Sequence, residues 1–307
     1  MKIVLLDAIT FGDTDLSAFN ELGEVVIYEK TAPNETLERI EGATVVVTNK
    51  VVITKEMMEK TPTLKLICIA ATGMNNVDLE AATMWSVDVK NVAGYSTDSV
   101  IQHTFSMLLY LMGHARYYDE VVQDGTYSNS GIFTDVSQPF FEIKNKKWGI
   151  IGLGEIGRGV AKVATAFGAK VCYYSTSGAN ANRDYLRVDL ATLLSTCDII
   201  TIHAPLNDAT RNLLDEKELH QCKDGAIVLN LGRGGIINED AVATLVDEKN
   251  IYFGLDVFEK EPLPKNSPLL RVTNKDRLYM TPHIAWTSVE AREKLIAQVI
   301  ENIKESF

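Results

Sequence analysis

The sequence predicts an α/β fold with two doubly wound, parallel-sheet domains. Short runs rich in Val, Ile and Tyr alternate with helical patterns along the chain, and this alternation indicates parallel strands covered by helices. The length of 307 residues favours two domains over one. A glycine-rich turn at 152–157 also stands between a strand pattern and a helical pattern, as it does in dinucleotide-binding sheets.

The first third of the chain contains enough candidate strands for one small sheet. These strands are 2–6, 24–28, 43–47, 65–69 and 87–91. From Asp98 to His114 apolar residues recur at spacings of three and four, which predicts a long helix. The polar stretch from Gly125 to Gln138 is rich in Ser, Thr and Gly and predicts a loop.

A second series of candidate strands fits a complete dinucleotide-binding sheet. These strands are 146–151, 170–174, 198–202, 226–231, 251–257 and 277–280. Thr287, with Glu290 three residues on, forms a capping-box pattern that predicts the start of a last helix, which we expect to pack on the first domain. The expected domains are therefore 1–98 completed by 286–307, and 99–285.

The composition is that of an ordinary globular chain, with 46% hydrophobic and 23% charged residues. The net charge of −11, without any run of Lys and Arg, argues against nucleic acid or an anionic membrane as the partner. The four cysteines form no C-x-x-C pair and stand beside no His at ligand spacing, so we expect reduced thiols and no metal site. No apolar stretch reaches the ~20 residues of a membrane span, and we expect a cytoplasmic protein.

The motif GLGEIG is the strongest local signal for a cofactor. Gly152 permits a tight turn, Gly154 lets the backbone approach a pyrophosphate, and Gly157 lets helix and strand pack closely. The pyrophosphate would lie at the helix N-terminus, where free N–H groups favour an anion. A plain structural turn is the alternative, but the strand before the motif and the helix after it favour NAD or NADP.

One expected feature of an NAD site is missing. Ser175 stands where an acidic residue would bind the adenosine ribose hydroxyls. The hydroxyls of Ser175, Thr176 and Ser177 can donate to a 2′-phosphate, but no Arg stands beside them, and the nearest downstream is Arg183. We therefore expect weak discrimination between NAD and NADP.

Arg233, Glu261 and His283 each follow a candidate strand of the second series. Ligands bind at the carboxyl ends of the strands in an open parallel sheet, so these side chains can converge on one site. Arg offers a planar fork of donors for a carboxylate, and His exchanges protons near neutral pH. Taken singly, each has an ordinary structural explanation, as a surface ion pair, a solvated loop residue and a turn histidine.

Several segments together resemble the D-isomer-specific 2-hydroxyacid dehydrogenases, over nearly the whole chain. They are ATGMNNVD (71–78), NVAGYSTDSVIQHTF (91–105), GLGEIG (152–157), HAPL (203–206), NLGRGG (230–235), GLDVFEKEP (254–262) and TPHIAW (281–286). The second and last segments are similar to the glycerate dehydrogenase or hydroxypyruvate reductase branch. The resemblance implies a flavodoxin-like substrate domain, a Rossmann dinucleotide-binding domain and a homodimer.

The resemblance also implies roles for individual residues. Arg233 would bind the carboxylate of a small D-2-hydroxy or 2-oxo acid, His283 would be the acid/base, and Glu261 its partner. Thr72, Gly73, Met74 and Trp286 would also bind the substrate. Implied cofactor-binding residues are Gly152, Gly154, Glu155, Ile156, Gly157, Ser175, Thr176, His203, Ala204, Pro205, Leu231, Gly232, Arg233, Asp256 and His283.

Other functions stay open at this point. The same family fold serves as an NAD(H)-sensing corepressor, and complete Arg, Glu and His positions do not exclude that role. A methyltransferase on a dinucleotide fold is disfavoured by the Glu and His segments. A formate dehydrogenase is disfavoured because that group carries Gln where Glu261 stands, and a phosphoglycerate dehydrogenase with a regulatory tail because the chain ends soon after the last helix.

Overall fold

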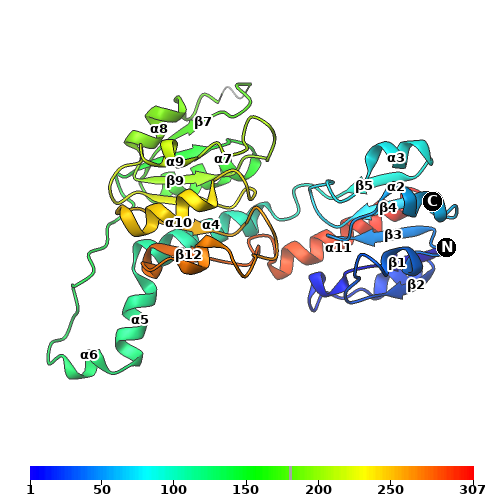
Figure 1. Ribbon diagram of the computed structural model, residues 1–307, viewed down its shortest axis with the longest axis horizontal. Coiled ribbons are helices and arrows are strands. Elements are labelled where there is room, and N and C mark those ends of the chain that lie inside the picture. Colours follow the sequence, from blue (N-terminus) through cyan, green and yellow to red (C-terminus); the bar gives the residue numbers. More distant parts are fainter. Residues whose placement is uncertain (180–181) are drawn as a thin grey trace. The chain divides into compact units, whose positions relative to one another are not determined.

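The computed structural model describes residues 1–179 and 182–307, and these residues form two compact units (Figure 1). Unit 1 comprises Met1–Ser96 and Thr287–Phe307, and unit 2 comprises Thr97–Trp286. The chain therefore passes from one unit to the other twice, and each passage lies within two residues of the boundary expected from the sequence.

Unit 1 is built on a five-stranded parallel sheet with the order β2-β1-β3-β4-β5. The strands are β1 (Lys2–Leu5), β2 (Glu24–Ile27), β3 (Val45–Thr48), β4 (Leu66–Ile69) and β5 (Asp88–Asn91). Its helices are η1 (Ala8–Phe11), η2 (Ser17–Glu21), α1 (Thr36–Arg39), α2 (Lys55–Lys60), α3 (Leu79–Met84) and α11 (Val289–Lys304). This strand order is the flavodoxin-like one, which confirms the predicted fold of this part.

Helix α11 covers unit 1 through an apolar face of Leu295, Val299 and Ile303, all completely buried. The predicted capping box is wrong by one residue. Ser288, not Thr287, is the N-cap, because its extended backbone lets its Oγ accept a hydrogen bond of 3.2 Å from the Ala291 N–H.

Unit 2 contains a seven-stranded parallel sheet with the order β12-β11-β10-β9-β6-β7-β8, which confirms the predicted doubly wound fold. The strands are β6 (Lys147–Ile151), β7 (Lys170–Tyr174), β8 (Leu186–Arg187), β9 (Ile199–Ile202), β10 (Ile227–Asn230), β11 (Tyr252–Leu255) and β12 (Leu278–Met280). The sequence predicted all of these except β8. That edge strand has two exposed residues and is too short to produce a pattern.

Helices cover both faces of this sheet. α4 (Thr97–Met112) and α7 (Glu155–Ala166) pack on one face, around the buried Trp148. α8 (Leu190–Thr196), α9 (Glu216–Leu219) and α10 (Glu239–Glu248) pack on the other, around Phe253. Two short helices complete the unit, η3 (Pro268–Arg271) and η4 (Lys275–Arg277).

Two further helices extend away from the sheet of unit 2 (Figure 1). The helix predicted to reach His114 ends at Met112, and α5 (Ala115–Gln123) follows it; α6 (Thr126–Asn129) interrupts the loop predicted from Gly125 to Gln138. We call residues 115–141 the arm. In the described residues, none of these helices is long and apolar enough to cross a membrane.

Candidate active site

The predicted cofactor residues of unit 2 lie along one edge of its sheet. They follow the carboxyl ends of neighbouring strands: Asp256 after β11, Leu231 after β10, His203 after β9, Gly152 after β6 and Ser175 after β7. The chain changes direction across the sheet between β9 and β6, since the series β6-β7-β8 runs one way and β9-β10-β11-β12 runs the other. Ligands of doubly wound sheets bind at such a switch point.

The glycine turn leaves open space at the N-terminus of α7. Gly152 has a φ of +90°, and a Cβ there would lie 2.9 Å from the His203 carbonyl oxygen. A Cβ on Gly157 would overlap the Gly152 carbonyl, whereas a Cβ on Gly154, the N-cap of α7, would meet nothing within 4 Å. The turn is therefore closed toward the sheet and open at the N-terminus of α7, where an anion can approach the helix N–H groups.

Two polar side chains on this edge have buried nitrogen or oxygen atoms without a hydrogen-bond partner among the described residues. They are Ser175, through its Oγ, and His203, through both ring nitrogens. Burial lowers the pKa of His203 to about 3, so its ring is neutral at physiological pH. Unsatisfied donors and acceptors at strand ends, beside an open helix N-terminus, fit a dinucleotide.

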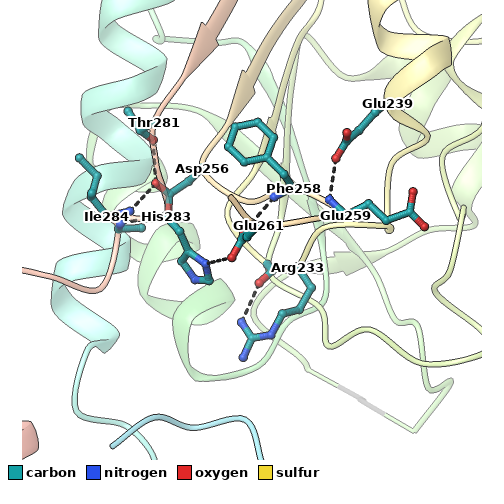
Figure 2. A network of polar contacts seen from close by, with 11 residues as sticks. Arg233, Glu239, Asp256, Phe258, Glu259, Glu261, Thr281, His283 and Ile284 are labelled. Atoms are coloured by element: carbon teal, nitrogen blue, oxygen red, sulfur yellow. Dashed lines mark hydrogen bonds and ion pairs between the residues drawn. The ribbon is translucent and has the colours of Figure 1, made fainter. Parts of the chain in front are cut away.

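Glu261 and His283 form an ion pair in unit 2 (Figure 2). Glu261 Oε2 lies 2.8 Å from His283 Nδ1, and the Phe258 N–H donates to Glu261 Oε1 at 3.0 Å. Both side chains keep part of their surface exposed. With an ionised Glu261, the hydrogen lies on Nδ1, and Nε2 is the nitrogen that can exchange a proton with a ligand.

Asp256 holds the segment that carries His283. Its carboxylate is completely buried: Oδ1 accepts from the Thr281 hydroxyl at 2.7 Å and the Ile284 N–H at 2.8 Å, and Oδ2 accepts from the Ala285 N–H at 2.9 Å. His283 itself has a φ of +55°. Asp256 therefore binds residues before and after His283 and fixes the turn between them (Figure 2).

Thr281 and His103 belong to the same network and were missed as site residues. His103 Nε2 lies 3.2 Å from Thr281 Oγ1 and 3.7 Å from Asp256 Oδ1. Burial lowers the pKa of His103, against the opposing effect of Asp256. No local sequence pattern predicts this contact, because His103 on α4 and Thr281 after β12 are far apart in the sequence.

Arg233 is exposed on a hydrogen-bonded loop after β10. Its NH1 donates to the Gly232 carbonyl at 2.8 Å. Buried Asn230 fixes the loop, donating to the Arg233 carbonyl at 2.9 Å and accepting from the Gly232 N–H at 3.1 Å. A Cβ on Gly234 would overlap the Phe258 carbonyl, so this loop packs against the one that carries Glu261 (Figure 2).

The remaining predicted substrate residues divide between the units. Thr72, Gly73 and Met74 follow β4 in unit 1, where Thr72 Oγ1 donates to the Val92 carbonyl at 3.1 Å and its carbonyl accepts from Asn91 at 2.7 Å. Trp286 is the half-buried last residue of unit 2. Among the described residues, no group of three or more His, Cys, Asp or Glu side chains is placed to hold a metal ion.

Comparison with known proteins gives consistent matches. Residues 105–285 match the sequence model of the family described as "D-isomer specific 2-hydroxyacid dehydrogenase, NAD binding domain". A Blautia hydrogenotrophica protein named hydroxypyruvate reductase is 35% identical, over 99% of this chain and 96% of the relative. A Methylorubrum extorquens protein named glycerate dehydrogenase is 34% identical, over 99% and 95%. A solved acyclic imino acid reductase, in complex with NADPH and D-Arg, is 30% identical with a TM-score of 0.83, over 99% of this chain and 96% of that one.

Proposed function

This chain belongs to the D-isomer-specific 2-hydroxyacid dehydrogenase family and is a nicotinamide-dependent oxidoreductase, and from that premise we propose that it interconverts D-glycerate and hydroxypyruvate, or reduces glyoxylate. The names of the two relatives support glycerate and hydroxypyruvate as the substrate pair. The contact between Glu261 and His283, on the edge that also carries the glycine turn, is the observation that carries the proposal.

His283 supplies the proton in this reaction. A bound, reduced nicotinamide would supply the hydride for the substrate C2. The C2 oxygen gains negative charge as the hydride arrives, and His283 Nε2 gives it a proton; in the reverse direction Nε2 takes that proton back. Glu261 orients the ring through Nδ1 and stabilises its positive charge.

Arg233 binds the substrate carboxylate. Its guanidinium presents paired donors, and the Asn230 hydrogen bonds and the packing of Gly234 hold its loop in place. The loop of Thr72, Gly73 and Met74 in unit 1 has the glycine turn that suits a carboxylate, and Trp286 in unit 2 offers an apolar surface. The buried Asp256 acts through the backbone that carries His283.

The same sheet edge holds the cofactor. Gly152, Gly154, Glu155, Ile156 and Gly157 cradle the pyrophosphate. Ser175 and Thr176 face the adenosine ribose, and NAD and NADP both serve because no carboxylate occupies position 175. The segments His203, Ala204, Pro205 and Leu231, Gly232 line the nicotinamide half.

A second copy of this chain covers the arm, which gives a homodimer. The arm exposes Val122, Ile132, Phe133, Val136, Phe140 and Phe141. Phe133 is 89% exposed and Val136 is 81% exposed. Apolar side chains gathered in this number on an extended segment are typical of an interface.

Turnover with a panel of 2-oxo acids tests the proposed activity. Nicotinamide absorbance is followed with hydroxypyruvate, glyoxylate, pyruvate and phenylpyruvate, with NADH and with NADPH, and the oxidation of D-glycerate is compared with that of L-glycerate. We expect the highest kcat/KM for hydroxypyruvate or glyoxylate and oxidation of the D isomer alone. A flat response to the whole panel, with the cofactor still bound, would favour the NAD(H)-sensing alternative.

A further inference from the structure

The edge strand that the sequence did not predict brings an arginine to the cofactor edge of unit 2. β8 pairs in parallel with β7, and Arg187 lies opposite Tyr173. Tyr173 Oη accepts a hydrogen bond of 3.0 Å from the Asn182 N–H, which fixes the returning chain against β7. Paired residues of neighbouring strands face the same side of a sheet, so Arg187 lies on the side of Tyr173, the side covered by α7.

The Arg187 side chain reaches the loop that follows β7. Its NH1 donates to the Gly178 carbonyl at 2.9 Å. That loop turns back on itself, since the Gly178 N–H donates to the Ser175 carbonyl at 3.3 Å with a φ of +71° at Gly178. A guanidinium has five N–H donors, so one bond to Gly178 leaves others for a ligand. No arginine is adjacent to this loop in the sequence, but the fold brings Arg187 to it.

The charges around this loop favour an anion. In the described part of the chain no carboxylate lies within ion-pair distance of Arg187, although the protein as a whole carries a net charge of −11. The nearby Asp189 is engaged as the N-cap of α8, where it accepts from the N–H and the hydroxyl of Thr192. Ser175, in place of an acidic residue, adds no repulsion.

The hydroxyl groups of the loop complete an anion site. Ser175 is buried, and its Oγ has no partner in the part of the chain that the structure describes; Thr176 is half-buried and Ser177 is exposed. Hydroxyls and a guanidinium are the donors that recognise a phosphate, and they offer less to a ribose hydroxyl. The group that differs between the two cofactors at this position is the 2′-phosphate of NADP.

We infer that Arg187, together with the hydroxyls of Thr176 and Ser177, binds the 2′-phosphate of NADP(H), so that this enzyme binds NADPH more tightly than NADH. The inference rests on the proposed function only in placing the dinucleotide on this edge of the sheet. The arginine in this role lies on β8, outside the loop that carries Thr176 and Ser177.

Equilibrium binding tests the inference without any turnover. The dissociation constants of NADPH and NADH are measured by calorimetry for the wild type, Arg187→Gln, Arg187→Lys and the control Arg183→Gln, an exposed arginine in the same returning segment. We expect Arg187→Gln to weaken NADPH binding roughly 10- to 100-fold, as the loss of charge-assisted hydrogen bonds does, and to leave NADH binding nearly the same. Arg187→Lys should give an intermediate loss.

Three results would overturn the inference. The first is a wild type that binds NADH more tightly than NADPH. The second is an equal effect of Arg187→Gln on both cofactors, and the third is a loss of NADPH affinity in Arg183→Gln as large as that in Arg187→Gln. A failed 2-oxo acid panel with intact, Arg187-dependent NADPH binding would instead refute the proposed substrate and leave this inference standing.

Discussion

His283 has a left-handed backbone conformation, with a φ of +55°, which residues other than glycine seldom adopt. Such a conformation costs on the order of 1–3 kcal/mol and persists only where its surroundings enforce it. Here the buried Asp256 carboxylate binds the N–H groups of the next two residues, Ile284 and Ala285. The imidazole is therefore positioned by its backbone as well as by Glu261.

Replacing His283 by Ala should remove most turnover and leave the affinity for the cofactor nearly intact. The proton donor acts on the substrate oxygen, and general acid catalysis contributes roughly 10²- to 10⁴-fold in rate. The measurements are kcat with hydroxypyruvate and the dissociation constant of NADPH. His220→Ala is the matched control, since His220 is exposed and its ring lies 3.7 Å from Glu216. A fall in kcat of less than about tenfold would remove His283 from the role of acid.

His203 predicts how the stability of the protein depends on pH. Burial lowers its pKa from an ordinary value of 6.5 to about 3 in the folded protein. Below pH 6.5 the unfolded chain takes up a proton on this ring that the folded protein does not. The stabilisation is therefore full above pH 6.5 and is lost progressively as the pH falls toward 3. Between these two pKa values, His203 alone changes the free energy of unfolding by about 1.4 kcal/mol per pH unit.

His203→Leu should flatten this dependence. Between about pH 7 and pH 5, the midpoint of thermal unfolding should fall less in the variant than in the wild type. The exposed His220 again supplies the control, as His220→Leu. Parallel curves for wild type and His203→Leu would show that the ring is protonated in the folded state.

At the scale of elements, the arm exposes several large apolar side chains to water. Phe133→Ser combined with Val136→Ser should shift the protein from dimer to monomer, because it removes the most exposed apolar groups of the proposed interface. Light scattering coupled to size-exclusion chromatography gives the mass. Met84→Ser, at an exposed apolar residue of unit 1, should leave the mass unchanged. A wild type that is monomeric at micromolar concentration would exclude the dimer.

The long, apolar elements were predictable from the sequence, and the short or exposed ones were not. β3 and β4 are buried along their whole length, so continuous apolar runs revealed them. β8 contains Leu186 and Arg187, and two exposed residues carry no periodicity. The last helix was predicted, but its first residue was not, since Thr287 and Ser288 are both acceptable caps and only the backbone selects one.

The candidate site shows the same division. That Asp256 and His203 follow strands was predictable, because a parallel sheet places all its carboxyl ends on one edge. The burial of Asp256, its bonds to the His283 segment and the reach of Arg187 to Gly178 were not. These contacts depend on strand order and loop path, and no local pattern encodes either.

On the scale of the whole molecule, unit 1 depends on a helix from the far end of the chain. α11 packs against β4, and Asn302 Nδ2 donates to the Asn91 carbonyl at 3.2 Å. Val299→Asp would bury a charge on the apolar face of α11 and should cost several kcal/mol, on the order of 3–5. Hydrogen exchange should then show lost protection in residues 1–96 and retained protection in unit 2. The exposed Glu301→Ala on the same helix is the control, and equal loss in both units would mean that they unfold together.

Because unit 1 is discontinuous in the sequence, its two segments are synthesised at different times. Its five strands are synthesised first, but α11 follows only after Thr97–Trp286 has been made. Unit 2 is contiguous and has every one of its residues available earlier, so the part of the protein translated second is the part that can fold to completion first. Until α11 arrives, the nascent N-terminal sheet exposes the apolar surface on which that helix packs, and during that interval the new chain is most exposed to aggregation and to capture by chaperones.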